Sequence, residues 1–231
     1  MTTAAPPNDL PAVRGSLAYE AAKRAIDVAI ALGVLAGLLP LWLLVALAVR
    51  LTSPGPALHR AQVAGRNGVP FTYYKFRSMQ AGADDAVQRE FRRDLIRENK
   101  PFRVERTIDG EERAVYKVVD DPRVTRVGRI IRKLSIDEVP QLINVLRGEM
   151  SVVGPRPPLL WEVEYYDDWH RERLAVKPGI TGAAQVRSRQ GLPFDEMVRL
   201  DIDYVRRRSL WLDLTLILRT PVALLRDMGR S

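Results

Sequence analysis

Residues 28–49 read VAIALGVLAGLLPLWLLVALAV and contain no charged side chain. At about 1.5 Å per residue, a helix formed by this run would be about 33 Å long, which matches the hydrocarbon core of a bilayer. A secretory signal peptide is disfavoured, because the run is longer than a signal core and follows a polar, proline-containing tail. The sequence therefore predicts a membrane-embedded segment.

The residues of this segment do not decide whether it crosses the membrane or returns to the side from which it entered. Pro40 lies near its centre, where it removes one backbone hydrogen bond and clashes with the preceding turn, although spanning helices tolerate such kinks. Basic residues, which mark the cytoplasmic side, occur at both ends: Lys23 and Arg24 before the run, and Arg50, Arg60 and Arg66 after it. A re-entrant helix broken at Pro40 and a kinked spanning helix both fit.

The chain divides into three parts around this run. Residues 1–18 are rich in small residues and proline and are expected to form a disordered tail. Residues 19–52 form the membrane segment, and residues 53–231 form a globular domain. Because 46% of the 231 residues are apolar, the chain has enough apolar side chains for a sizeable core.

The globular part predicts an α+β fold that is mostly helical. Asn67-Gly68 indicates a hairpin that leads into a strand at residues 71–76, and Asp109-Gly110 indicates a second strand pair within residues 100–120. Ser135, with Glu138 three residues later, has the spacing of a capping box at the start of a helix. Helices are expected at residues 82–99, near 122–133, and at 136–147, 161–175, 194–208 and 209–226. The last of these suits an interfacial amphipathic helix.

Composition limits the chemistry of any site. The chain has no cysteine, which excludes disulfides, cysteine-ligated zinc, iron–sulfur clusters and thiol catalysis, and its two histidines exclude a histidine-rich metal site. Carboxylates and basic residues must then carry most of any chemistry. The net charge of +8 suits nucleic acid, an anionic membrane surface or phosphorylated substrates.

Asp137 and Glu138 are the strongest candidates for this chemistry. Two carboxylates at a helix start also have a plain structural interpretation, since negative charge is favourable there. Their context favours a functional one, because they follow a basic stretch and precede a Gly-Pro-Arg-Pro loop. A carboxylate in a basic pocket stays ionised and can act as a nucleophile, while a neighbouring carboxylate can bind Mg²⁺.

Several arginines and lysines are candidates for binding phosphate. Lys75 and Arg77 follow the hairpin strand, Arg156 lies in a rigid proline-bounded turn, and Arg189 follows the exposed loop at residues 178–182. Neither a Rossmann glycine pattern nor a P-loop is present, so nucleotide binding would not use those loops. Each signal is weak alone, but four of them occur in order behind one membrane segment.

Taken together, these motifs resemble the bacterial monotopic phosphoglycosyl transferases. The resemblance covers about residues 20–225. It rests on the following segments: Lys23-Arg24-x-x-Asp27, the apolar run with Pro40, Ser53-Pro54-Gly55-Pro56, Gly65-Arg66-Asn67-Gly68, Tyr74-Lys75-Phe76-Arg77-Ser78-Met79, Leu134-Ser135-Ile136-Asp137-Glu138-Val139-Pro140-Gln141-Leu142, Ser151-Val152-Val153-Gly154-Pro155-Arg156-Pro157 and Lys177-Pro178-Gly179-Ile180-Thr181-Gly182.

The resemblance implies an enzyme with a re-entrant helix-break-helix anchor in one leaflet of the bacterial inner membrane and a cytoplasmic catalytic domain. It implies that Asp137 attacks a UDP-sugar, that UMP leaves, and that polyprenyl phosphate then takes the phospho-sugar. In this scheme Glu138 holds Mg²⁺, and Asp201 matches a supporting carboxylate. Lys75, Arg77, Arg156 and Arg189 match residues that bind the substrate phosphates. Whether the chain forms a homo-oligomer stays open.

This sequence departs from the family pattern before the Asn-Gly turn. Ala61 and Val63 stand where glutamine and arginine are usual, so Arg60 or Arg66 would have to substitute for that arginine. Leu39 replaces a serine before the proline, and Ser78 replaces a threonine while keeping its hydroxyl. Two other classes of function fit the sequence less well. A basic membrane adaptor would need no fixed carboxylate pair, and a nucleic-acid binder lacks an evident recognition helix.

Overall fold

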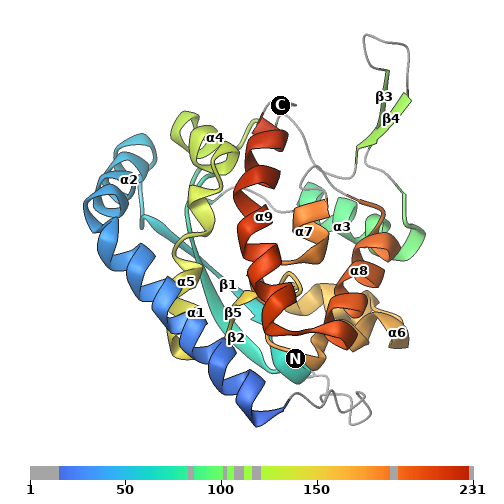
Figure 1. Ribbon diagram of the computed structural model, residues 1–231. Helices are drawn as coiled ribbons and strands as arrows, with labels where there is room; N and C mark the ends of the chain where they lie inside the picture. Colours follow the sequence, from blue (N-terminus) through green and yellow to red (C-terminus); the bar gives the residue numbers. More distant parts are fainter. Residues whose placement is uncertain are drawn as a thin grey trace.

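A computed structural model describes residues 16–82, 86–100, 103–106, 112–115, 121–187 and 192–228 (Figure 1). Almost all of the expected tail over residues 1–18 lies outside these residues. Within the described part, helices predominate and the strands form three separate two-stranded sheets. The expectation of a mostly helical α+β fold is confirmed.

The apolar N-terminal region forms two helices that meet at a sharp bend. Helix α1 (Leu17–Gly37) and helix α2 (Leu39–Thr52) are bent by 67° relative to each other. Among the described residues, no single helix has the length and hydropathy of a membrane span, whereas this bent pair has them jointly. The pattern of residues 28–49 therefore corresponds to a broken helix.

The break lies at Leu38, two residues before the expected position at Pro40. Pro40 is in the first turn of α2, where its missing N–H and fixed φ are tolerated. The helix thus ends before the proline instead of kinking at it. The indole nitrogen Nε1 of Trp42 donates to the carbonyl oxygen of Val34 at 3.1 Å, which ties α2 back onto α1 across the bend.

Strands β1 (Leu58–Ala64) and β2 (Pro70–Phe76) form the expected antiparallel hairpin. The connection is longer than a two-residue turn, because it includes the short 3₁₀ helix η1 (Arg66–Gly68), where Asn67 has a φ of 57°. Helix α3 (Ala86–Glu98) follows, and strands β3 (Arg103–Arg106) and β4 (Glu112–Val115) form the second expected pair. The turn at Asp109-Gly110 lies outside the described residues.

The expected helix over residues 136–147 is wrong at its start. Helix α4 (Arg126–Lys133) is followed by Ser135 in the left-handed conformation at a φ of 55°, so Ser135 does not cap a helix. Residues Ile136–Glu138 form the 3₁₀ helix η2, and helix α5 (Gln141–Arg147) begins only after Pro140. Its expected end is confirmed, because Gly148 adopts the left-handed conformation of a helix C-terminus.

The predicted aromatic helix over residues 161–175 is divided into three short helices. These are η3 (Leu160–Tyr165), α6 (Asp168–Arg171) and η4 (Glu172–Ala175). They lie between strands β5 (Ser151–Val153) and β6 (Gly179–Thr181), which pair in parallel. A Cβ atom added at Gly179 would lie 2.0 Å from the backbone nitrogen of Gly154, so the two loops pack backbone against backbone.

The C-terminal part consists of helices that close the core. Helix α7 (Ala183–Arg187) was not expected from the sequence. Helices α8 (Phe194–Arg207) and α9 (Leu210–Met228) agree with the expected helices. Figure 1 shows α1 and α9 flanking the hairpin and β5. The largest cluster of buried apolar side chains joins these parts and includes Ala31, Val63, Val145, Val153 and Leu216.

Candidate active site

Asp137 and Glu138 lie on the 3₁₀ helix η2, between α4 and the start of α5. The left-handed Ser135 reverses the chain immediately after α4, and η2 packs against both α4 and β2. Lys75 lies near the end of β2, close enough for its charge to affect Asp137. The structure therefore brings together three predicted site residues: the two carboxylates and Lys75.

The electrostatic environment of Asp137 contains opposing charges. Burial, followed by the adjacent carboxylate of Glu138, raises the pKa of Asp137 to about 6, while the positive charges of Lys75 and Arg132 act in the opposite direction. At neutral pH the side chain is thus mostly a carboxylate, but its ionised form is less stable than that of an exposed aspartate. A half-buried carboxylate under the influence of two positive charges is suited to attack an electrophilic phosphorus.

Arg132 is a functional candidate that the sequence did not single out from its basic stretch. Its Nε donates to the hydroxyl oxygen of Ser78 at 2.7 Å, and its charge lies beside Asp137. A Cβ atom at Gly128 would lie 1.9 Å from the carbonyl oxygen of Ser78, so α4 sits directly on the chain after β2. Helical spacing gives a signal, since Gly128 and Arg132 are four residues apart on one face.

Arg77 makes a different set of contacts from the one expected. Its side chain is buried, and two of its guanidinium nitrogens donate to the carbonyl oxygens of Ser53 and Pro54, at 2.5 and 2.8 Å. These contacts fix the turn that leads out of α2. A role for Arg77 in binding phosphate stays a prediction.

Asp201 and Arg156 lie together at a second polar cluster. Asp201 is fully buried on α8 and forms an ion pair with the buried Arg173, which also donates to the hydroxyl of Tyr166 at 3.0 Å. Arg173 further donates to the backbone oxygen of Arg156 at 3.3 Å, and the exposed Arg156 side chain contributes positive charge near Asp201. Arg189 lies outside the described residues.

The carboxylate pair offers oxygen ligands of the kind that magnesium uses. No group of three or more His, Asp or Glu side chains suited to a metal occurs among the described residues. Magnesium does not need one, since it commonly uses one or two carboxylates together with substrate phosphates and water. The repulsion between Glu138 and Asp137, visible in the raised pKa of Asp137, is one that a bound cation would offset.

Comparison with known proteins assigns the chain to a family. A family model described as "Bacterial sugar transferase" matches residues 18–227, which is most of the chain. The chain belongs to the bacterial sugar transferase family. The motifs from Lys23 to Gly182 all fall within the matched region of this family.

Three relatives in the bacterial sugar transferase family illustrate the similarity. The chain is 39% identical to the exopolysaccharide production protein ExoY of Sinorhizobium fredii, over 90% of this chain and 87% of ExoY. It is 42% identical to a UDP-glucose:undecaprenyl-phosphate glucose-1-phosphate transferase of Caulobacter vibrioides, over 97% of this chain and 76% of that protein. It is also 42% identical to the galactosyl transferase CpsE of Streptococcus agalactiae, but the match spans only 36% of CpsE.

Proposed function

We propose that this chain transfers a sugar-1-phosphate from a UDP-sugar to polyprenyl phosphate, such as undecaprenyl phosphate, giving polyprenyl-diphospho-sugar and UMP. This would be the first membrane step in assembling a polysaccharide or glycoconjugate. The observation that carries the proposal is the half-buried Asp137 carboxylate, which lies within the electrostatic influence of Lys75 and Arg132. The names of its relatives support the same reaction class, since several are undecaprenyl-phosphate sugar phosphotransferases.

In the first half-reaction, a carboxylate oxygen of Asp137 attacks the β-phosphorus of the UDP-sugar. A bond forms between this oxygen and phosphorus, and the bond from the β-phosphorus to the bridging oxygen breaks. UMP leaves with that oxygen and its electron pair. Lys75 and Arg132, whose positive charges act on Asp137, bind the phosphate oxygens and stabilise the negative charge of the transition state.

In the second half-reaction, an oxygen of polyprenyl phosphate attacks the same phosphorus. The acyl phosphate bond breaks and returns the Asp137 carboxylate, so the enzyme ends each cycle unchanged. Glu138 and substrate phosphates would hold Mg²⁺, which neutralises phosphate charge and favours the leaving group. Arg77, Arg156 and Arg189 remain proposed phosphate contacts, and Asp201 a proposed supporting residue.

The reaction is tested by supplying the full-length protein with a UDP-sugar labelled in the sugar, without lipid acceptor. We expect denaturation-stable label on Asp137, one UMP released per label, and loss of the label with hydroxylamine or on addition of polyprenyl phosphate. Asp137→Asn should bind no label. Turnover by Asp137→Asn at the wild-type rate would exclude Asp137 as the nucleophile. Absence of UMP release by the wild-type protein with every UDP-sugar would instead favour the non-catalytic adaptor. A panel of UDP-sugars scored by UMP release identifies the sugar.

We also propose that α1 and α2 form a re-entrant anchor, with the catalytic domain on the cytoplasmic face of the bacterial inner membrane. Support comes from the 67° bend and from large apolar side chains that remain exposed on both helices and on α9. The most exposed of these are Leu17, Leu43, Leu44, Leu51, Trp211, Leu218, Val222 and Leu225. Such a surface fits contact with one leaflet.

The arrangement is tested with single cysteines, because the chain has none of its own. Cysteines introduced at positions 5 and 230 should both be shielded from a thiol reagent that cannot cross the membrane. Labelling of only one of them in intact cells would indicate a spanning helix.

A further inference from the structure

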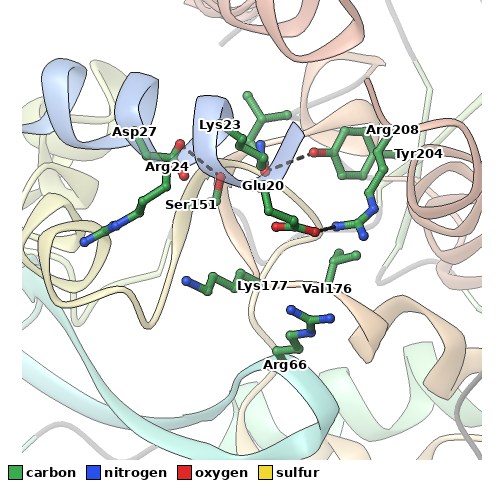
Figure 2. Close-up of a pocket in the computed structure, with 11 residues that line it drawn as sticks. Glu20, Lys23, Arg24, Asp27, Arg66, Ser151, Val176, Lys177, Tyr204 and Arg208 are labelled. Carbon is green, nitrogen blue, oxygen red and sulfur yellow. Dashed lines mark hydrogen bonds and ion pairs between the residues drawn. The ribbon is translucent and has the colours of Figure 1, made fainter. Parts of the chain in front are cut away.

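A small pocket lies beneath the N-terminal half of α1, away from Asp137. Figure 2 shows its lining, in which Lys177 lies between α1 and the side chain of Arg66. Five cationic side chains line the pocket, together with only two carboxylates, Glu20 and Asp27. The cations are Lys23, Arg24, Arg66, Lys177 and Arg208.

Two of these cations form ion pairs with carboxylates, and both carboxylates of the pocket are already engaged in ion pairs or hydrogen bonds. Arg208 pairs with Glu20 at 2.8 Å, and Lys23 pairs with Asp213 on α9 at 3.0 Å. Asp27 is buried and accepts hydrogen bonds from the hydroxyl of Ser151 and the backbone nitrogen of Val152. The carboxylates of the pocket therefore have little capacity left to neutralise further positive charge.

Arg24, Arg66 and Lys177 supply positive charge without a carboxylate partner among the described residues. The Arg24 guanidinium donates to the carbonyl oxygens of Val145 and Leu146 at the end of α5. A Cβ atom placed on Gly148 would lie 3.7 Å from the Lys177 ammonium and 3.9 Å from a guanidinium nitrogen of Arg24. The two like charges thus converge on one point.

This convergence of positive charges destabilises the charged form of Lys177. Burial, and then the positive charge of Arg24, lowers the pKa of Lys177. The negative charges of Asp27 and Glu20 act in the opposite direction, and Arg66 adds a smaller lowering effect. Like charges brought together in a partly buried position destabilise the fold unless an anion lies between them. The end of α5 offsets some of this repulsion, because its carbonyl groups carry partial negative charge.

We propose that Arg66, Lys177 and Arg24 form a second anion site that binds one phosphate group, distinct from the reacting centre at Asp137. Phosphate oxygens accept from forked guanidinium and ammonium donors at once, and the pocket is too small for a nucleotide-sugar. Between Pro70 and Lys75, strand β2 extends for about 17 Å. Arg66 precedes Pro70 and Lys75 lies beside Asp137, so the two sites are at opposite ends of the hairpin.

The phosphate could come from a phospholipid headgroup or from free phosphate, and the chemistry of recognition is the same. The test uses the full-length protein in nanodiscs and follows its thermal unfolding. One arm compares inorganic phosphate with chloride at matched ionic strength in phosphatidylcholine discs. The other arm compares phosphatidic acid discs with phosphatidylcholine discs in chloride. Both arms use wild type, Arg66→Gln/Lys177→Gln and, as a control of exposed charge, Arg199→Gln.

We expect phosphate in at least one arm to raise the unfolding midpoint of wild type by a few degrees, since a ligand that binds only the folded state stabilises it. The arm that responds identifies the source. Arg199→Gln should respond as wild type does, and Arg66→Gln/Lys177→Gln should not respond. Lys177→Arg should retain the response, which separates charge from folding.

The single variant Lys177→Gln separates an anion site from a structural lysine. If the site exists, this variant is at least as stable as wild type in chloride, because a repulsion has been removed. Its unfolding midpoint is lower than that of wild type only when phosphate is present. Equal loss of stability in both buffers would mean that Lys177 serves only the end of α5. That result, or an unchanged phosphate response in the double variant, would overturn the proposal. Neither outcome depends on whether Asp137 is the nucleophile.

Discussion

Arg132 and Ser78 join two distant parts of the chain at the candidate active site. The Arg132 Nε donates to the Ser78 hydroxyl at 2.7 Å, although 54 positions separate them in sequence. This bond holds the guanidinium on the side where its charge acts on Asp137. Ser78 stands where the family usually has threonine, and the structure shows what its hydroxyl contacts.

Removing that hydroxyl should impair turnover while leaving the fold intact. A hydrogen bond to a charged group contributes about 1.5–3 kcal/mol, so Ser78→Ala is expected to lower kcat/KM by about tenfold or more. Ser78→Thr should retain activity, because it keeps the hydroxyl. Steady-state UMP release measures both variants, and a fully active Ser78→Ala enzyme would show that the bond does not position Arg132.

The activity should rise with pH as Asp137 ionises. With the pKa of Asp137 raised to about 6, kcat/KM is expected to increase up to about pH 6 and then level off. Arg132→Gln removes a charge that lowers this pKa, so the rise should move to higher pH. Arg129→Gln, an exposed change on the same helix, should leave its position unchanged. A shift to lower pH in Arg132→Gln would contradict the assigned proximity.

Neutralising Asp137 should stabilise the protein while abolishing turnover. Because the folded-state pKa of Asp137 lies above its usual value of 3.8, ionisation disfavours the folded state. The cost is absent below about pH 4, grows between pH 4 and 6, and is complete above pH 6. Asp137→Asn should therefore gain about 1–3 kcal/mol at neutral pH and little at pH 4.

Denaturant unfolding at the two pH values measures this gain. Asp203→Asn is the control, since Asp203 is an exposed carboxylate on α8 that pairs with Arg207 at 2.8 Å. The control should show no comparable gain at either pH. A stability gain for Asp137→Asn that is equal at pH 4 and pH 7 would indicate that ionisation is not its cause.

Gly128→Ala should disrupt the packing of α4. The added Cβ would lie 1.9 Å from the carbonyl oxygen of Ser78, and backbone at that position cannot move aside easily. We expect a loss of about 3 kcal/mol or more, of the order seen for overpacked or strained cores. Gly33→Ala is the matched control within a helix, because no atom lies within 4 Å of its added Cβ. Thermal unfolding of both variants gives the comparison.

Replacing Asp201 should destabilise the fold, so that any loss of activity would follow from the loss of folded protein. Its ion pair with Arg173 is fully buried, and removing one member of such a pair costs about 3–5 kcal/mol. Asp201→Asn should therefore lower the unfolding midpoint strongly. An Asp201→Asn protein with wild-type stability and no activity would instead support a direct catalytic role.

Local patterns predicted most elements because each had its own signal. The hairpin at Asn67-Gly68, the end of α5 at Gly148 and helix α8 follow from turn residues and periodicity. The start of α5 was wrong because Ser135-to-Glu138 spacing is necessary but not sufficient for a capping box: Ser135 is left-handed and Pro140 cannot donate to a preceding turn. The start of α5 is therefore set by tertiary packing and not by local propensity.

The candidate site was predicted only in part, for a comparable reason. Asp137, Glu138 and Lys75 came from motifs and do lie together. Arg132 was hidden among several similar arginines, and only the packing of Gly128 against Ser78 selects it. The carbonyl contacts of Arg77 and the buried partner of Asp201 depend on chain segments that no local pattern connects.

The first half of α1 has a practical consequence for protein engineering. Arg24 caps α5, Asp27 accepts from Ser151 and Val152, and Ala31 lies in the main core. Deleting the N-terminal helices to obtain a soluble fragment would remove these partners and leave buried donors and acceptors unpaired. The pair of helices α1 and α2 is therefore not a module that can be exchanged on its own. Chimeras between relatives should exchange α1 together with the segments it contacts, or move their junction into α2.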